Sequence, residues 1–323
     1  MKVIIISSTA NSQLAPFIQE QMDSLRSIGI TCLLFPIAQN GVLGYLKHLK
    51  LLKKLILLEK PDLIHAHYGL SGLLANLQRK IPVITTFHGT DINNKKIRWI
   101  SAIAARLSKK SIYVTEQLKT LAGNDDGAVI PCGVDTTIFS PQKMEIAKEK
   151  MKLDTSKNYV LFCSSFNNPI KNSPLAISAF KDIKKRLALN MELLELNNFS
   201  REEVSSLLNA SYCLIMTSFS EGSPQVIKEA LATNRPIVST AVGSVRELIL
   251  NVNGCSIVEP NLESVKYGLE KCIKFSIEHQ GTNGREHIHN NLLDLKQIAT
   301  SIQSLYINAI NKKHSPETRN RDK

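Results

Sequence analysis

Residues 213–239 read CLIMTSFSEGSPQVIKEALATNRPIVS, and this stretch decides the fold. It predicts a buried strand over Cys213–Thr217, a polar loop, a helix over Pro224–Ala232 and a second strand over Pro236–Ser239. Two short apolar strands joined through a helix make the βαβ unit of a parallel sheet. The chain is therefore expected to be an α/β protein.

The same alternation of strands and helices continues through the rest of the chain. In the first part it predicts strands over Lys2–Ile6, Ile30–Phe35, Asp62–Ala66, Val83–Phe87, Ser111–Thr115 and Ala128–Ile130, a helix from Pro16, and helices over Leu46–Leu58 and Gly72–Gln78. In the second part it predicts strands over Tyr159–Ser164 and Glu192–Leu196, and helices over Pro174–Leu187, Arg201–Leu208 and Leu292–Ile310. Two such series predict two Rossmann-like parallel-sheet domains, whose ligands bind at the carboxyl ends of the strands.

The length of 323 residues also favours two domains, because single cores stop growing at roughly 250–300 residues. The segment Pro131–Pro141 is rich in turn residues and is expected to link them. We expect an N-terminal domain over residues 1–139, a C-terminal domain over 140–300 and a flexible polar tail over 311–323. The last helix, near 300–310, is expected to pack back on the N-terminal domain.

The bulk composition limits the partners and the location. The formal net charge of +12 favours an anionic partner, but nucleic acid is not expected, because aromatic residues make up only 6% and no zinc-finger spacing occurs. No signal peptide or membrane-spanning run is visible, so a cytoplasmic location is expected. No metal site is expected either, since the six cysteines lack ligand spacing and no Asp-x-Asp motif occurs.

The predicted helix over residues 46–58 has a basic side. Its lysines are Lys47, Lys50, Lys53 and Lys54, and its apolar residues Leu46, Leu49, Leu52, Leu55 and Ile56 lie largely on the other side. Basic amphipathic helices can lie on anionic membranes, which would make the protein peripheral on the inner face of the cell membrane. The alternative is a core helix with a solvated lysine face.

Two carboxylates bracket the start of the helix at Pro224. Glu221 lies just before it and Glu229 about one and a half turns inside it, while Gly222 and Ser223 can present backbone N–H groups to an anion. At this spacing both carboxylates could reach two parts of one ligand. The spacing alone equally fits a capping acid followed by a solvated helix residue.

Four sequence blocks resemble retaining glycosyltransferases of the GT-B fold, in glycosyltransferase family 4 (glycosyl transferases group 1). They are SEGSPQVIKEALATNRPIVSTAVGSVREL at 220–248, PDLIHAH at 61–67, TFHGTD at 86–91 and IPCGVD at 130–135. Their order and spacing fit the family and extend to about Tyr306. The resemblance implies two Rossmann-like domains that face each other across a cleft.

The resemblance also implies roles for particular residues. Glu229 would bind the ribose hydroxyls, Glu221 the hydroxyls of the donor sugar, and Lys171 the diphosphate of the leaving group. Catalytic roles would fall to His88, which would sit by the sugar, and to Lys171 and Glu221. The implied donor-binding residues are Ser165, Gly222, Ser223, Pro224, Gln225, Val226 and Glu229, and the implied cleft loops of the N-terminal domain contain Thr9, Ala10, Asn11 and Asp91.

Three positions depart from the family pattern. Ser164-Ser165 replaces the usual Gly-Arg after the first strand of the second domain, and Asn172 replaces the glycine after Lys171. The loop over residues 7–12 lacks the Gly-Gly turn of many relatives. A looser contact with phosphate, or a different acceptor, would follow from these changes.

The implied activity is that of a hexosyltransferase that retains anomeric configuration and uses neither metal nor cofactor. Its donor would be a UDP-sugar, or with less support a GDP-sugar, and its acceptor a saccharide or lipid-linked saccharide in polysaccharide or lipopolysaccharide synthesis. Two alternatives stay open. One is a nucleotide-sugar epimerase or hydrolase, and the other is a non-catalytic GT-B subunit.

Overall fold

The computed structural model describes residues 1–9, 14–38, 41–279 and 281–311, without the side chains of residues 41–46. The chain forms two compact units, one of Met1–Pro131 with the chain from Lys296 onward, the other of Cys132–Leu295. An isolated bridge joins Val134 to Asp294, so the chain enters and leaves the second unit at neighbouring points. The first crossing lies before the expected boundary at residue 139.

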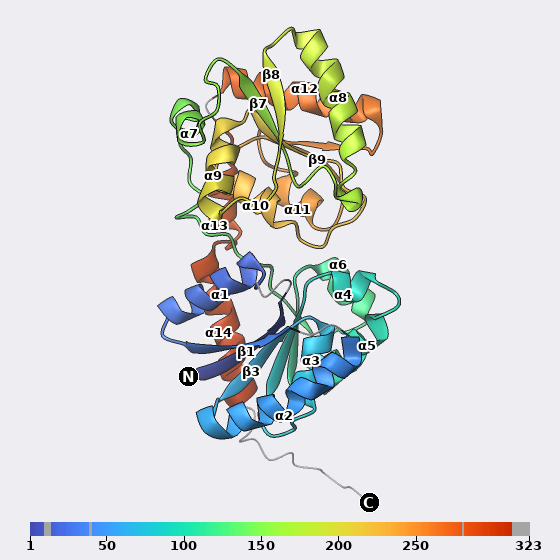
Figure 1. The fold of residues 1–323 in the computed structure, drawn as a ribbon, viewed down its shortest axis with the longest axis vertical. Coiled ribbons are helices and arrows are strands. Elements are labelled where there is room, and N and C mark those ends of the chain that lie inside the picture. Colours follow the sequence, from blue (N-terminus) through green and yellow to red (C-terminus); the bar gives the residue numbers. More distant parts are fainter. Residues whose placement is uncertain (10–13, 39–40, 280, 312–323) are drawn as a thin grey trace, which may run out of the picture. The chain divides into compact units, whose positions relative to one another are not determined.

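The first unit contains a six-stranded parallel sheet in the order β2-β1-β3-β4-β5-β6 (Figure 1). Its strands are β1 (Lys2–Ser8), β2 (Thr31–Ile37), β3 (Leu63–His67), β4 (Val83–Phe87), β5 (Lys110–Tyr113) and β6 (Ala128–Val129). Its helices are α1 (Pro16–Ser27), α2 (Gly41–Glu59), α3 (Gly69–Asn76), α4 (Thr90–Asn93), α5 (Arg98–Leu107), α6 (Glu116–Ala122) and α14 (Leu295–Asn311).

Alternate residues of β1, the second strand from one edge, contact two different helix layers. Val3 and Ile5 belong to a core cluster with residues of α1 and of α14, among them Tyr306. Ile4 and Ile6 belong to a cluster with residues of α2 and α3. Both faces of this strand are buried, which explains why KVIIIS reads as a continuous apolar run. The last helix therefore covers one face of the N-terminal sheet.

The second unit contains a five-stranded parallel sheet in the order β11-β10-β9-β7-β8. Its strands are β7 (Asn158–Phe162), β8 (Met191–Glu195), β9 (Cys213–Met216), β10 (Ile237–Thr240) and β11 (Ser256–Val258). Its helices are α7 (Met144–Lys150), the 3-10 turn η1 (Pro169–Lys171), α8 (Ser173–Leu187), α9 (Arg201–Ala210), α10 (Gln225–Ala232), α11 (Val245–Ile249), α12 (Leu262–Glu278) and α13 (Gly284–Asn290).

The two parallel sheets confirm the predicted α/β class and its Rossmann-like units. Predicted elements recur within a few residues, and β4 has the predicted bounds. Helices α5 and α12 were not predicted, although both are amphipathic in the structure. Helix α14 ends at Asn311, inside the expected tail, and the remainder of that tail lies outside the described residues. No helix in the described parts of the chain is long and apolar enough to span a bilayer.

Candidate functional site

The strand order of the second sheet reverses beside β7. Strand β8 lies on one side of β7, and β9 to β11 lie on the other. Ligands of open parallel sheets bind outside the carboxyl ends of the strands at such a switch point. The loops that leave β7 and β9 carry Lys171 and Glu221, so the topology brings together the two loops singled out from the sequence.

Lys171 is the last residue of the 3-10 turn η1, and the residues on both sides of it stabilise the backbone conformation of this turn. Asn168 caps the turn by accepting the N–H of Ile170 at 3.2 Å. Asn172 follows in the left-handed region with φ +51°, a conformation that asparagine tolerates better than most residues. The asparagine that stands in place of the family glycine therefore adopts a conformation that glycine also adopts readily.

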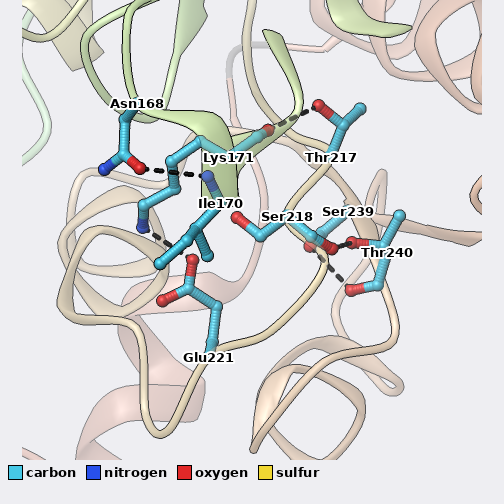
Figure 2. Close-up of polar contacts among 8 residues, drawn as sticks. All are labelled: Asn168, Ile170, Lys171, Thr217, Ser218, Glu221, Ser239 and Thr240. Carbon is cyan, nitrogen blue, oxygen red and sulfur yellow. Dashed lines mark hydrogen bonds and ion pairs between the residues drawn. The ribbon is translucent and has the colours of Figure 1, made fainter. Parts of the chain in front are cut away.

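Lys171 and Glu221 form an ion pair with 2.6 Å between Nζ and Oε1 (Figure 2). Their side chains are only 18% and 14% exposed, so solvent screens the pair less than a surface pair. The two loops are also bonded directly, because Thr217 Oγ1 contacts the Lys171 carbonyl oxygen at 3.0 Å and the N–H of Phe219 donates to Ile170. A sugar donor could thus contact a cation and a carboxylate whose two loops are already held together by hydrogen bonds.

A third loop supports the backbone between Glu221 and α10. Ser244 donates its N–H to the Gly222 carbonyl oxygen at 3.0 Å, and the Ser223 and Ser244 hydroxyls lie 3.1 Å apart. Gly243 has φ +54°, and a Cβ there would lie 2.0 Å from the Gly222 oxygen. Only glycine therefore fits at 243 without displacing the loop that is expected to hold the sugar and distal phosphate.

A buried lysine lies beneath the same loop. Lys228 Nζ is fully buried and donates to the Cys132 carbonyl oxygen at 2.6 Å and to Ser223 Oγ at 3.3 Å. Burial lowers the pKa of Lys228 from its ordinary value, with the carboxylate of Glu229 acting in the opposite sense. This group ties the loop to the segment that enters the unit, and sequence analysis did not single it out.

Glu229 is not a solvated helix residue. Its side chain is 3% exposed, and its Oε1 accepts from Arg201 at 2.6 Å. The guanidinium of Arg201 also lies over the Phe139 ring, 4.7 Å from its centroid. Arg201 occupies the first turn of α9, where Ser200 and Glu203 form a capping box. The S-x-x-E pattern was readable in the sequence, but the pairing of Arg201 with Glu229 was not.

The first unit contains a separate row of aromatic side chains at the ends of β3 and β4. His65 contacts Tyr306 of α14 at 2.6 Å and Thr86 at 2.7 Å, and its ring stacks on His67. His67 Nδ1 lies 2.9 Å from Nε2 of His88. Burial lowers the pKa of His67 to about 3, so its ring is neutral at physiological pH.

The neutral state of His67 fixes the direction of this hydrogen bond. His67 Nε2 is buried and has no partner among the described residues. A bare ring nitrogen is better tolerated there than an orphaned N–H, so we assign the His67 proton to Nδ1, which donates to His88. A neutral His88 then carries its proton on Nδ1. The rings of Phe17 and Tyr68 each lie 4.9 Å from His88 and limit its orientation.

Asp91 accepts hydrogen bonds from the backbone of its own loop. Its Oδ1 accepts the N–H groups of His88 and Gly89 at 3.1 and 3.0 Å, and its Oδ2 accepts that of Gly69 at 3.2 Å. Burial raises the pKa of Asp91 to about 6, against the effect of these backbone donors. Its visible contacts make it a brace for the His88 loop, and a contact with ligand stays a prediction.

Asp91→Ala is expected to destabilise the first unit by about 3 kcal/mol, because three backbone donors lose their acceptor. Asp91→Asn should cost less, since its amide oxygen can still accept from His88 and Gly89. The only tryptophan, Trp99, lies in this unit, so urea unfolding followed by its fluorescence measures the change. Asp125→Ala, at an exposed position, is the matched control, and equal midpoints for Asp91→Ala and this control would contradict the assignment.

The remaining predicted residues divide into three groups. Ser165 lies in the β7 loop, where its hydroxyl accepts the N–H of Asn167. Gln225 turns its side chain to the Gly133 carbonyl and Val226 packs against the core, so only their backbone groups stay candidates for the donor. Thr9 donates its N–H to Ile37 at the end of β1, whereas Ala10 and Asn11 lie outside the described residues.

An apolar hollow of about 420 Å³ lies at the carboxyl end of β8. Its lining includes Phe166, Leu194, Asn197 and Phe199. Aromatic and aliphatic walls with a few polar groups are typical of small-ligand pockets.

Comparisons with known proteins agree on one family. The model for glycosyltransferase family 4 matches residues 2–138, and the model for glycosyl transferases group 1 matches residues 157–274. An uncharacterised glycosyltransferase of Methanocaldococcus jannaschii is 28% identical over 284 residues, which is 76% of each chain. The two models between them match most of both units.

Two further proteins extend the comparison. The UDP-Gal:alpha-D-GlcNAc-diphosphoundecaprenol alpha-1,3-galactosyltransferase of Escherichia coli is 24% identical over 311 residues, covering 82% of this chain and 80% of that one. The crystal structure of Anabaena HepE in complex with UDP-glucose has a TM-score of 0.72 at 16% identity, and covers 95% of this chain and 100% of that one. The structural likeness to HepE shows the GT-B fold.

Proposed function

The chain belongs to glycosyltransferase family 4, and we propose that it moves a sugar from a UDP-sugar, with GDP-sugar the second choice, to a saccharide or lipid-linked saccharide acceptor. The transfer would retain anomeric configuration and need no metal. The observation that carries this proposal is the Lys171–Glu221 pair at the switch point of the second sheet. It offers one cation for the leaving diphosphate and one carboxylate for the sugar.

The choice of donor and acceptor rests on relatives and on the hollow beside β8. HepE is a protein whose structure contains UDP-glucose, and the relative in E. coli is named for UDP-Gal and a diphosphoundecaprenol acceptor. We place the base in the hollow lined by Phe166 and Phe199, and the ribose at Glu229. A lipid-linked acceptor would bring the Lys47–Lys54 part of α2 to the inner face of the cell membrane.

The proposed step breaks the bond between the anomeric carbon and the diphosphate oxygen. The bonding electrons leave with the diphosphate, and Lys171 and the N–H groups at the start of α10 stabilise its charge. The acceptor hydroxyl attacks from the same face and gives its proton to the leaving phosphate. Neither an external base nor a covalent carboxylate intermediate is needed. His88 would sit beside the sugar and position it.

The defining experiment measures nucleotide release from UDP- and GDP-sugars with and without a lipid-extract acceptor. Release that depends on the acceptor supports the transferase, and nuclear magnetic resonance of the product's anomeric proton reports the stereochemistry. Change without acceptor would indicate an epimerase or hydrolase. Binding without release would indicate a non-catalytic subunit, and an inverted linkage would reject the proposed step.

We expect full activity in excess EDTA. In this scheme the ammonium of Lys171 and helix N-terminal amides meet the charge on the diphosphate, a task that a bound cation has in metal-dependent transferases. Initial rates with EDTA and with added Mg²⁺ or Mn²⁺ measure the effect. Activity that is lost in EDTA and restored by Mg²⁺ would reject metal independence.

A further inference from the structure

The positive charge of the chain is concentrated in one stretch of the first unit. Residues 41–110 contain 13 lysines and arginines but only three acidic residues, so they carry +10 of the chain's formal +12. Of those three acids, Asp91 is buried and Glu59 pairs with Lys2. This excess is therefore a property of one region and not of the whole surface.

Helix α2 exposes a strip made of both lysines and leucines. Positions 47, 50, 51, 54, 57 and 58 share one face at helical spacing, and all six side chains are exposed. Leu57 and Leu58 are 67% and 73% exposed. The sequence pattern had suggested a largely polar lysine side, but the structure shows exposed leucines on that side as well. Leu52 and Ile56 on the opposite face supply the contacts with the core.

Helix α5 repeats this pattern. Trp99, Ala102, Ile103 and Arg106 form its exposed strip, and Trp99 is 60% exposed. Lys95 and Lys96 precede the helix and are also exposed. The helix ends at a hollow of about 510 Å³, whose polar lining includes Arg106, Lys109 and Lys110 with Asp126. An aromatic residue flanked by cations is typical of membrane–water interfaces.

The two strips belong to one layer of helices. Helix α3 packs against both α2 and α5, and all three cover the same face of the six-stranded sheet (Figure 1). Most α3 residues are buried, so the exposed surface of the layer comes largely from its two neighbours. The exposed lysines of α2, with Lys95, Lys96 and Arg106, form no ion pair with any described residue. Their charge is available to a partner.

We propose that this α2–α5 face binds the surface of an anionic lipid bilayer. Its cations suit anionic head groups, and its leucines and Trp99 suit the apolar boundary just beneath them. A nucleic acid would use the cations but would leave the exposed leucines in water. The inference extends membrane contact from the lysine-rich part of α2 to α5. It concerns binding alone, so it can succeed or fail independently of transferase activity.

The single tryptophan makes the test direct. Vesicles of phosphatidylglycerol and phosphatidylcholine are expected to shift Trp99 emission to shorter wavelength, whereas pure phosphatidylcholine vesicles should give little shift. Sedimentation with the anionic vesicles should weaken as salt rises, because salt screens exposed charges. An unchanged Trp99 spectrum with bound protein would place α5 outside the contact and overturn the proposal.

Charge-reversal variants distinguish vesicle binding by this face from binding that depends only on the net charge of the chain. The pair Lys50→Glu and Lys54→Glu should weaken vesicle binding at least tenfold, since each lysine near an anionic surface contributes roughly fivefold. Lys184→Glu with Lys185→Glu, exposed on α8 of the second unit, changes the charge equally and should leave binding intact. Equal loss in both pairs would reject a local surface. An equal Trp99 shift with heparin would show a general polyanion site, which also contradicts the lipid assignment.

Discussion

Lys171→Ala is expected to lower turnover by roughly ten- to a thousand-fold, the range for loss of one preorganised electrostatic donor. The large effect follows from the local shortage of cations. Serine occupies position 165, where the family pattern predicts arginine, while Arg201 is paired with Glu229 and Lys228 is bonded beneath the loop. Lys171 is also paired, with Glu221, but it lies at the switch point, and it is the cation that we propose meets the diphosphate.

Lys171→Arg should recover part of the turnover, because charge matters more than shape at a point contact. The matched control is Lys181→Ala, an exposed lysine of α8 in the same unit. Turnover at saturating donor is the quantity to compare. An undiminished rate for Lys171→Ala would overturn this account of the leaving group.

The ion pair raises the question of whether Lys171 acts only by holding Glu221. A double-mutant cycle with Glu221→Gln separates the two roles. If Lys171 contacts the diphosphate itself, Lys171→Ala should lower turnover further in the Glu221→Gln background. If the second substitution has no further effect, Lys171 is a positioning residue for the carboxylate.

The switch-point pair shows what sequence could predict and where it stopped. Strand composition located β7 and β9, and with them the loops that carry Lys171 and Glu221. The 2.6 Å contact between them depends on the bonds of Thr217 and Phe219, which no spacing encodes. The sequence showed Asn172 in place of the family glycine, but not that this asparagine adopts the left-handed backbone that glycine favours.

Burial explains the other differences between sequence and structure. Glu229 fitted a solvated helix position equally well, because only tertiary packing decides that its side chain is 3% exposed. Asp91 looked like a ligand contact in HGTD, yet its oxygens accept from the backbone of its own loop. Lys228 carries no local signal, since its partner Cys132 is distant along the chain.

Arg201→Met is expected to destabilise the second unit by about 3 kcal/mol, because it leaves Glu229 as a buried charge without its partner. Glu229→Gln should cost less, since the Arg201 side chain is 23% exposed and can turn to water. Arg201→Lys should lie between them, as it keeps the charge but loses the planar group over Phe139. Urea unfolding followed by hydrogen exchange in α9 and α10 measures the three costs.

When KM for the donor is measured, substitution of Glu229 should have a larger effect than substitution of Arg201, which reverses the order expected for stability. Glu229→Gln should raise KM for the donor on the order of tenfold with turnover nearly unchanged, because a ribose contact is equal in ground and transition states. Arg201→Lys should change KM less, since the carboxylate remains. In the double variant Arg201→Met with Glu229→Met, stability should recover relative to Arg201→Met, because no buried charge is left. If Arg201→Met is as stable as the wild type, or if the double variant is the less stable of the two, the pair is not the buried support for the ribose-binding carboxylate.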